Sequence, residues 1–319
     1  MFTSRFGKDG FIVEADYSAL EVVTLAAFSK DKALVKALMD NIDMHCLRLA
    51  ANINEPYEEV LRKCKDESHP DHARYDQMRT DIKPRAFAYQ YGATAHGIAF
   101  ATGCTVEEAQ AFIDAEKALF PDVEAWYEEE IFKTVESNTE AHREQIGEFW
   151  RVYRTGTWQS QGGTTYEFRQ YPKMIWDGGK RTEIMQFKPT QMRNYPIQGE
   201  SGFFVQGMCG VIARWFVSQD FFGGKAVIIN QVHDAVYLDV HKDVLDTVCA
   251  GVKAILESLP QHFNRVHGYD LQVPFPAAVE FGPTMLHKNH WEPGVLGNPE
   301  VQARLEKQWA DIDKYKEAT

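Results

Sequence analysis

Two aspartates lie where apolar runs of the sequence end. Asp16 follows the strand-like run 10–15, and Asp234 lies between two strand-like runs within 225–240. A carboxylate at the end of an apolar strand is costly unless it is paired or bound to a cation. If both strands join one sheet, the pair could hold two Mg²⁺ ions about 3.5–4 Å apart, one activating a hydroxyl nucleophile and one stabilising a leaving group. The alternative is that each aspartate caps a turn.

A second set of candidates forms a row with a spacing of four residues: Arg79, Lys83, Phe87 and Tyr91. On an α-helix this row spans roughly 18 Å along one slowly drifting stripe. Two cations at one end can neutralise a triphosphate, and two aromatic rings at the other can meet a sugar and a base. The alternative is an ordinary amphipathic helix with exposed cations and buried rings.

The elements that must position these residues mix strands and helices without a regular βαβ alternation, which predicts an α+β fold. Thr105 and Glu108 fit a capping box that begins a helix. Gly92 fits the end of the helix that carries the row from Arg79 to Tyr91. Residues 66–78 are polar and predict a connection, and 150–189 predict one or two β-hairpins. The remaining predicted strand is 275–282. The remaining predicted helices are 31–51, 56–65, 106–119, 121 to about 135, 199–219, 243–259 and the tail from 301.

Composition limits the classes of protein. Hydrophobic residues make up 44% and aromatic residues 13% of the 319 residues, which supports a folded core. The five cysteines are scattered without a CxxC pair, so we expect neither a disulfide framework nor a thiolate zinc site, and a reducing compartment.

The net charge and the termini bear on partners and location. The net charge of -12 counts against nucleic-acid binding unless basic residues gather locally. No signal peptide opens the sequence, and polar residues interrupt its most apolar stretch, 203–222. We therefore expect a soluble cytoplasmic protein with no membrane partner.

Five short motifs resemble those of family A DNA polymerases, the DNA polymerase I family, and occur in that family's order. DYSALE (16–21) resembles motif A, RTDIKPRAFAYQYG (79–92) resembles motif B with every spacing intact, and QVHDAV (231–236) resembles motif C. NYPIQG (194–199) is similar to the family's NxPxQG segment, and DMH (43–45) to its DIH. The resemblance covers nearly the whole chain and is weakest at 136–190 and in the C-terminal tail.

The resemblance implies a two-metal nucleotidyl-transfer site. Asp16 and Asp234 would bind two Mg²⁺ ions, for which Mn²⁺ can substitute, with the Tyr17 carbonyl as a further ligand. Lys83 would also protonate or stabilise the leaving pyrophosphate. His233 would lie at the primer terminus.

The remaining implied roles concern nucleotide and DNA. Arg79, Lys83 and His45 would bind the incoming triphosphate, and Glu21 would exclude the ribose 2′-hydroxyl. Phe87 would sense the 3′-hydroxyl and disfavour dideoxynucleotides. The other implied contacts are those of Tyr91, which would cover the nascent base pair, and of Asn194 and Gln198, which would touch the primer-template.

The sequence departs from the family pattern at three places. Ala235 replaces the acidic residue that follows the motif C aspartate, so we expect weakened or retuned activity. Pro84 requires either that the helix begin near Thr80, which places Pro84 in its first turn, or that the helix be kinked. Thr190 stands where a basic residue is common, and Lys188 or Arg193 is the candidate replacement.

The implied fold is a polymerase palm, an antiparallel sheet with packed helices, plus helical fingers, with the thumb absent. We expect palm at 1–30, fingers at 31–135, a connection with β-hairpins at 136–190, and palm with a tail helix at 191–319. Only 15 residues precede Asp16, so a second polypeptide is expected to supply the thumb, the first palm strands and an exonuclease, as in some split bacteriophage polymerases. In that case the location would be the host cytoplasm.

The expected function is DNA-dependent DNA synthesis from dNTPs on primer-template DNA, with release of pyrophosphate. Two alternatives stay open. A single-subunit RNA polymerase shares the palm and a similar motif B, but should lack Glu21 in this setting. A non-catalytic DNA-binding or scaffold subunit derived from a polymerase is the alternative outside the enzymes.

Overall fold

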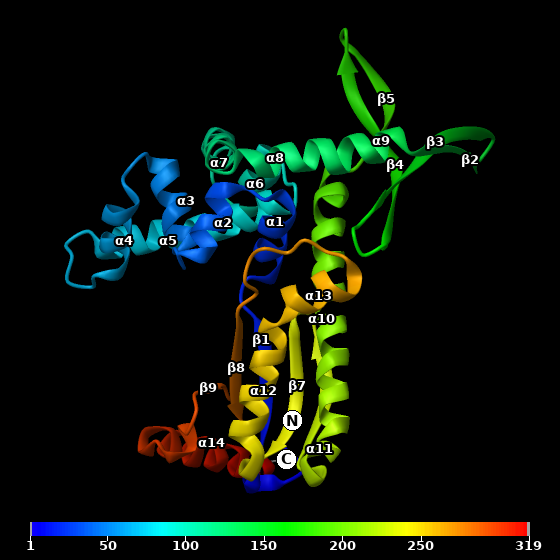
Figure 1. The fold of residues 1–319 in the computed structure, drawn as a ribbon. Coiled ribbons are helices and arrows are strands. Elements are labelled where there is room, and N and C mark those ends of the chain that lie inside the picture. The colour runs from blue at the N-terminus through cyan, green and yellow to red at the C-terminus, as the bar shows by residue number, and fades with distance from the viewer. Residues whose placement is uncertain (1, 318–319) are drawn as a thin grey trace. The chain divides into compact units, whose positions relative to one another are not determined.

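The computed structural model describes residues 2–317, without the side chains of Asp177, Lys316 and Glu317. The chain forms two compact units, each described by itself below (Figure 1). The first unit combines residues 2–22 with residues 200–317, and the second unit comprises residues 23–199. Among the described residues, no helix is both long enough and apolar enough to cross a bilayer.

The first unit contains an antiparallel five-stranded sheet in the order β6-β7-β1-β8-β9. Its centre is β1, which is buried along most of its length and pairs with β7 on one side and with β8 on the other. The strands are β1 (Gly10–Tyr17), β6 (Ala226–Val232), β7 (Ala235–His241), β8 (Ala277–Gly282) and β9 (Asn289–His290).

Helices pack against this sheet. Helix α12 contacts β1, β7 and β8, and the approach of α12 to α10 is close because Gly251 has no side chain. A Cβ atom there would lie 2.2 Å from the Trp215 ring. The helices are α10 (Pro189–Ser218, whose first part belongs to the second unit), α11 (Asp220–Gly224), α12 (Leu245–Glu257), α13 (Leu259–His267) and α14 (Pro299–Glu317); short 3₁₀ turns span Gly7–Asp9, Lys242–Val244 and Val295–Gly297.

The second unit is helical over its first part. Its core gathers apolar side chains from the helices between Cys46 and Ile113, with Ile98 and Phe112 fully buried. The helices are α1 (Leu20–Ser29), α2 (Lys32–Met39), α3 (Met44–Ile53), α4 (Tyr57–Lys65), α5 (His72–Gln90), α6 (Ala95–Thr102), α7 (Val106–Leu119), α8 (Pro121–Trp126), a π-helical turn (Tyr127–Phe132) and α9 (Lys133–Ser137). The predicted capping box at Thr105 and Glu108 is confirmed.

A four-stranded antiparallel sheet follows in the second unit, in the order β2-β3-β4-β5. It forms two long hairpins that project from α9, as Figure 1 shows. The strands are β2 (Thr139–Ile146), β3 (Phe149–Gln159), β4 (Thr165–Asp177) and β5 (Lys180–Phe187). Together with the first sheet and the helices, these hairpins confirm the predicted α+β fold.

Three helix boundaries differ from the prediction. The helix predicted at 199–219 begins ten residues earlier, since α10 spans Pro189–Ser218. The polar stretch 66–78 is not wholly a connection, because α5 begins at His72 and buries Tyr75 on the face that also buries Ile82 and Ala86. Pro84 is therefore interior, and the alternative that the helix begins near Thr80 is wrong. The predicted helix 31–51 is divided between α2 and α3, because Asp43 caps the start of α3.

One buried ion pair ties α3 to α7 in the second unit. Nε of Arg48 donates to both carboxylate oxygens of Glu116, at 3.1 and 3.2 Å. Both side chains are almost fully buried, and burial raises the pKa of Glu116 even though Arg48 opposes that shift. Each charge in this pair depends on the other, since an unpaired buried charge is strongly destabilising.

We predict that Arg48→Met lowers the free energy of unfolding of the second unit by about 3–5 kcal/mol, because Glu116 then stays buried without a counter-charge. The double variant Arg48→Met/Glu116→Leu should recover most of that loss. Urea unfolding followed by circular dichroism measures both. Arg62→Met, which breaks an exposed pair with Glu59, is the control and should change stability by less than about 1 kcal/mol. A double variant as unstable as Arg48→Met would contradict this account.

Candidate active site

The register of two strands brings the candidate aspartates together in the first unit. Asp16, near the end of β1, lies opposite Ala235, the first residue of β7. Asp234 immediately precedes Ala235 in the two-residue turn that joins β6 to β7. The sequence prediction that the strands carrying these carboxylates join in one sheet is thereby confirmed.

The electrostatics of the pair are unfavourable for two ionised carboxylates. Burial, the charge of Asp234 and the charge of Glu14 raise the pKa of Asp16 to about 6, and a hydrogen bond with Asp234 adds to the shift. Oδ1 of Asp16 is buried and has no hydrogen-bond partner within residues 2–317. A buried acceptor beside a second carboxylate is a place where a cation would be favourable.

Small side chains lie directly beside Asp16 in the sheet. Its direct neighbours on the two flanking strands are Ala235 and Ala278, which share its face of the sheet. One step along the same face, Glu14 lies opposite Glu280. Lys288 pairs with Glu14 at 2.7 Å and with Glu280 at 3.4 Å, so that a cation compensates this acidic row.

The donor set fits a magnesium site that is completed by substrate. Mg²⁺ is usually held by one or two carboxylates, with waters and substrate phosphates as its other ligands. The described residues contain no cluster of three or more His, Cys, Asp or Glu side chains with metal-binding geometry, so the protein would supply the carboxylates of Asp16 and Asp234. The hydroxyl of Tyr17 is already bonded to the carbonyl of Leu256 at 2.8 Å, which leaves its main-chain carbonyl as the group that could reach a metal.

Two further predicted residues flank the pair. His233 is exposed at the hairpin turn, with a left-handed backbone (φ 54°) that places it beside Asp234. Glu21 lies in the first turn of α1.

The row Arg79, Lys83 and Phe87 lies on α5, in the second unit, and Tyr91 follows directly at the helix end. The face that α5 buries is formed by Tyr75, Ile82, Ala86 and Tyr89. Arg79 borders that face, since it lies between Tyr75 and Ile82 at helical spacing and its side chain is only 17% exposed. The side chain of Phe87 is 52% exposed, so the alternative of an amphipathic helix with buried rings does not account for it. Lys83 forms no ion pair with any described residue, so its ammonium group is available to an anionic ligand.

Arg79 is held by a residue that the sequence analysis gave no role. Its Nη2 donates to Asp43 at 2.8 Å, and Lys65 approaches the same carboxylate at 3.0 Å. Burial alone would raise the pKa of Asp43, but hydrogen bonds from Arg79, the Cys46 amide and Lys65 hold that pKa well below its usual range. Asp43 was visible in the DMH segment, yet only the structure shows that it competes for Arg79.

His45 is neutral in this setting. Burial and the nearby charges of Arg48 and Arg79 lower the pKa of His45 to about 4, and its Nδ1 is buried without a hydrogen-bond partner within residues 2–317. At neutral pH this side chain can donate or accept a hydrogen bond but adds no positive charge.

The 194–199 segment lies on α10. Gln198 is exposed, and Oδ1 of Asn194 is buried without a partner among the described residues. Gly199 lets β4 pack on the helix, since a Cβ atom there would lie 2.4 Å from the Tyr166 ring. Arg193 is buried and paired with Glu124, which leaves Lys188 as the more accessible basic residue near Thr190.

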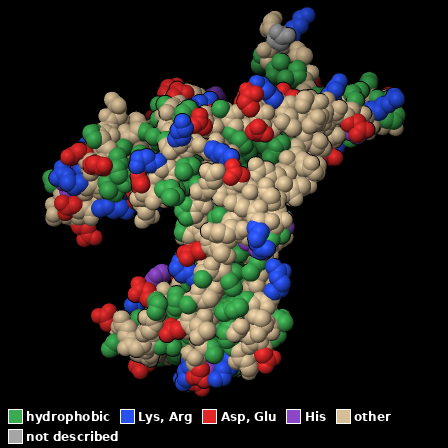
Figure 2. All heavy atoms as spheres, viewed as in Figure 1, with side chains coloured by type: hydrophobic (Ala, Val, Ile, Leu, Met, Phe, Trp, Pro, Cys, Tyr) green, Lys and Arg blue, Asp and Glu red, His purple; other side chains and the backbone are tan. Residues whose placement is uncertain are grey.

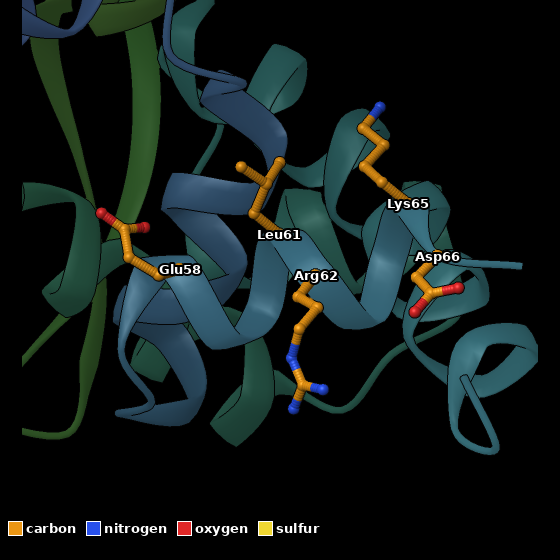
Figure 3. A pocket seen from close by; sticks show the side chains of 5 residues that line it. All are labelled: Glu58, Leu61, Arg62, Lys65 and Asp66. Atoms are coloured by element: carbon orange, nitrogen blue, oxygen red, sulfur yellow. The ribbon is translucent and has the colours of Figure 1, made fainter. Parts of the chain in front are cut away.

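A separate open hollow on the second unit lies over α4 (Figure 3). Its cations are already engaged, because Arg62 pairs with Glu59 at 2.9 Å and Lys65 with Asp43 at 3.0 Å. None of the predicted site residues lines it; the lining residues are Glu58, Leu61, Arg62, Lys65 and Asp66. The hollow therefore does not change the candidate site.

Comparison with known proteins gives a consistent result. The family model described as "DNA polymerase family A" matches residues 1–287. DNA polymerase I of Pseudomonas aeruginosa is 26% identical over 77% of the chain, that of Bacillus subtilis is 25% identical over 87%, and the DNA polymerase of Bacillus phage SP01 is 26% identical over 88%. The matched part is 22–26% of these relatives, so the chain spans about a quarter of their length.

Among solved structures, the chain resembles the "POL domain of Pol1 from M. smegmatis complex with DNA primer-template and dNTP". The TM-score is 0.58 at 17% sequence identity, and the match covers 89% of this chain and 41% of that one. At this identity the likeness concerns the fold.

We predict that the chain, without divalent metal, loses stability as the pH rises from about 4 to about 6. The raised pKa means that the folded state keeps a proton on Asp16 that the unfolded chain releases, so folding is favoured on the acidic side. Because Asp16 is partly exposed to solvent, the change should be about 1–2 kcal/mol.

Asp16→Asn should remove this pH dependence and raise the melting temperature at pH 7. Thermal melts in chelator between pH 4 and pH 8 measure it, with Asp311→Asn on exposed α14 as the control. An unchanged pH profile in Asp16→Asn would contradict the assignment.

We predict that Asp43→Asn binds a deoxynucleoside triphosphate severalfold more tightly. Asparagine can still cap α3, but it no longer holds Arg79 through a charge. Titration calorimetry measures the affinity, and Asp76→Asn on the exposed side of α5 is the control. Weaker binding by Asp43→Asn would show instead that Asp43 positions Arg79 for the ligand.

Proposed function

Because the chain belongs to DNA polymerase family A, we propose that it catalyses template-directed transfer of nucleotides from dNTPs to a primer 3′-hydroxyl. The observation that carries this proposal is the Asp16–Asp234 pair, fixed by the β1–β7 register, with a buried oxygen that lacks a partner. That arrangement suits divalent cations better than it suits a structural role. Two bound Mg²⁺ ions would activate the primer hydroxyl and stabilise the leaving pyrophosphate.

The residues of α5 supply the complementary chemistry for the triphosphate. Lys83 is free of ion pairs among the described residues, so we assign it contact with the phosphates and a proton for the leaving group. Arg79 joins it by exchanging its contact with Asp43 for a phosphate. His45, neutral at physiological pH, contributes a hydrogen bond and no charge.

The remaining roles concern the choice of substrate. We assign Glu21 to exclusion of a 2′-hydroxyl, which distinguishes this proposal from an RNA polymerase. Exposed Phe87 is assigned to the sugar, and Tyr91 to the nascent base pair. Asn194, Gln198 and His233 are assigned to the primer-template.

In this proposal the first unit corresponds mainly to the palm and the helical part of the second unit to the fingers. The parts of a polymerase outside the matched quarter must act with this chain, whether they come from a longer polypeptide or from a second one. A second chain that carries thumb and exonuclease stays a prediction.

The test is Mg²⁺-dependent primer extension by the chain together with its missing polymerase parts. We predict that Asp16→Asn and Asp234→Asn each lower the rate at least about 10³-fold, because each removes a charge that would hold the metals, while primer-template binding stays within about twofold. Asp311→Asn serves as the control.

Parallel reactions with rNTPs separate DNA synthesis from RNA synthesis. Extension that is unchanged by Asp234→Asn, or equal with rNTPs and dNTPs, would refute the proposal. Primer-template binding without extension in the wild-type chain would favour the scaffold alternative.

A further inference from the structure

The β2–β3 hairpin of the second unit ends in exposed apolar side chains. At its base it is anchored, because Gly156 packs so closely on Val135 of α9 that a Cβ atom would lie 2.3 Å from the Val135 carbonyl oxygen, and Trp158 is buried. Toward its tip the same strand exposes Trp150 by 62% and Val152 by 60%. Large apolar side chains that contribute nothing to a core are a feature of binding surfaces.

The two faces of this hairpin differ in charge. On the face that carries Tyr153, the cations are neutralised. Arg169 lies 3.9 Å above the Tyr153 ring and pairs with Glu144, and Arg151 pairs with Glu183 at 3.3 Å. This face already satisfies its own charges.

The opposite face, which we call the Trp150 face, carries Arg143, Trp150, Val152 and Arg154. The register sets Arg143 directly opposite Val152, so the two arginines flank the apolar residues. Both arginines are exposed, and neither has an ion-pair partner within residues 2–317. Nη1 of Arg154 donates to the hydroxyl of Thr139 at 3.0 Å, which leaves its charge uncompensated.

The hairpin that carries the Trp150 face is less acidic than the rest of the chain. The β2–β3 hairpin, residues 139–159, contains three Lys and Arg against three Asp and Glu, whereas the rest of the chain contains 31 against 43. In Figure 2 hydrophobic and basic side chains lie together at the end of the β2–β3 hairpin. A surface that combines unpaired arginines with an open indole ring in an acidic protein suits an anionic ligand with flat rings.

We propose that the Trp150 face binds single-stranded DNA. A base stacks on the Trp150 ring, and neighbouring phosphates contact Arg143 and Arg154. Side chains two residues apart on one face of a strand are roughly 6.6 Å apart, so Trp150, Val152 and Arg154 cover about 13 Å. Bases in a duplex are already stacked on both sides, so only the bases of a single strand are free to stack on the Trp150 ring.

The site needs no metal, dNTP or primer end, and the proposal goes beyond the polymerase function. The test uses the full chain in EDTA without nucleotide, and the fluorescence anisotropy of a labelled oligo-dT of about 12 nucleotides. Trp150→Ala should weaken binding by at least about fivefold. Arg143→Ala/Arg154→Ala should lower the slope of log affinity against log salt by about 1.4, because two phosphate contacts are lost.

Phe149→Ala is the matched control. Phe149 is the adjacent aromatic residue, is 79% exposed and points to the opposite face, so its removal should leave the affinity unchanged. Combined with the same polymerase parts as in the primer-extension test above, Trp150→Ala should still extend a saturating primer-template in the presence of Mg²⁺. A failure of the catalytic proposal would abolish extension but leave oligo-dT binding intact, so the two results are separable.

Three results would overturn the proposal: equal affinities of Trp150→Ala and the wild-type chain, equal losses in Phe149→Ala and Trp150→Ala, or a blunt duplex bound as tightly as the single strand. Self-association that Trp150→Ala abolishes, without oligo-dT binding, would assign the face to a second copy of the chain and would equally overturn it.

Discussion

The unfavourable proximity of Asp16 and Asp234 is the constraint on which the candidate site depends. Strand pairing between β1 and β7 holds both carboxylates, and burial together with their mutual repulsion raises the pKa of Asp16 to about 6. A fold that needed only a stable pair of inner strands would avoid this arrangement of two carboxylates. The residues directly beside Asp16 are alanines, and Lys288 compensates the acidic row one step away. The first unit is therefore less stable without a cation beside these carboxylates than it would be with one.

The sequence predicted the helix and the hairpin that carry the candidate residues better than it predicted the contacts that these residues make. The spacing of Arg79, Lys83 and Phe87 predicted a shared helical stripe, and the polar turn at His233 and Asp234 predicted the hairpin. The start of α5 was missed because its first turns are polar and are held by a single buried ring, that of Tyr75. The contacts of Asp43 with Arg79 and of Lys288 with Glu14 join residues 36 and 274 positions apart, which no local pattern encodes.

The two clusters of candidate residues treat charge in opposite ways. Around Asp16, the negative charge of the neighbouring carboxylates exceeds the positive charge that one lysine supplies. On the helices of the second unit, burial together with the charges of Arg48 and Arg79 lowers the pKa of His45 and keeps this side chain neutral, while Asp43 holds Arg79 and Lys65. An anionic ligand entering the second cluster meets Lys83, which has no ion-pair partner among the described residues, and Arg79, which Asp43 already holds. Binding would therefore combine direct contact with Lys83 and exchange of the Arg79–Asp43 ion pair.

The discontinuity of the first unit also has a consequence for biosynthesis. Strand β1 leaves the ribosome well before β7, its partner at Asp16, which is more than 200 residues further along the chain. At typical elongation rates of about 5–20 residues per second, β1 waits for roughly 10–40 s with both of its edges unpaired. The intervening helices can fold during this interval, because their contacts are local. The sheet that holds the carboxylates is thus among the last parts to form, and until it does, the nascent chain exposes a strand prone to aggregation.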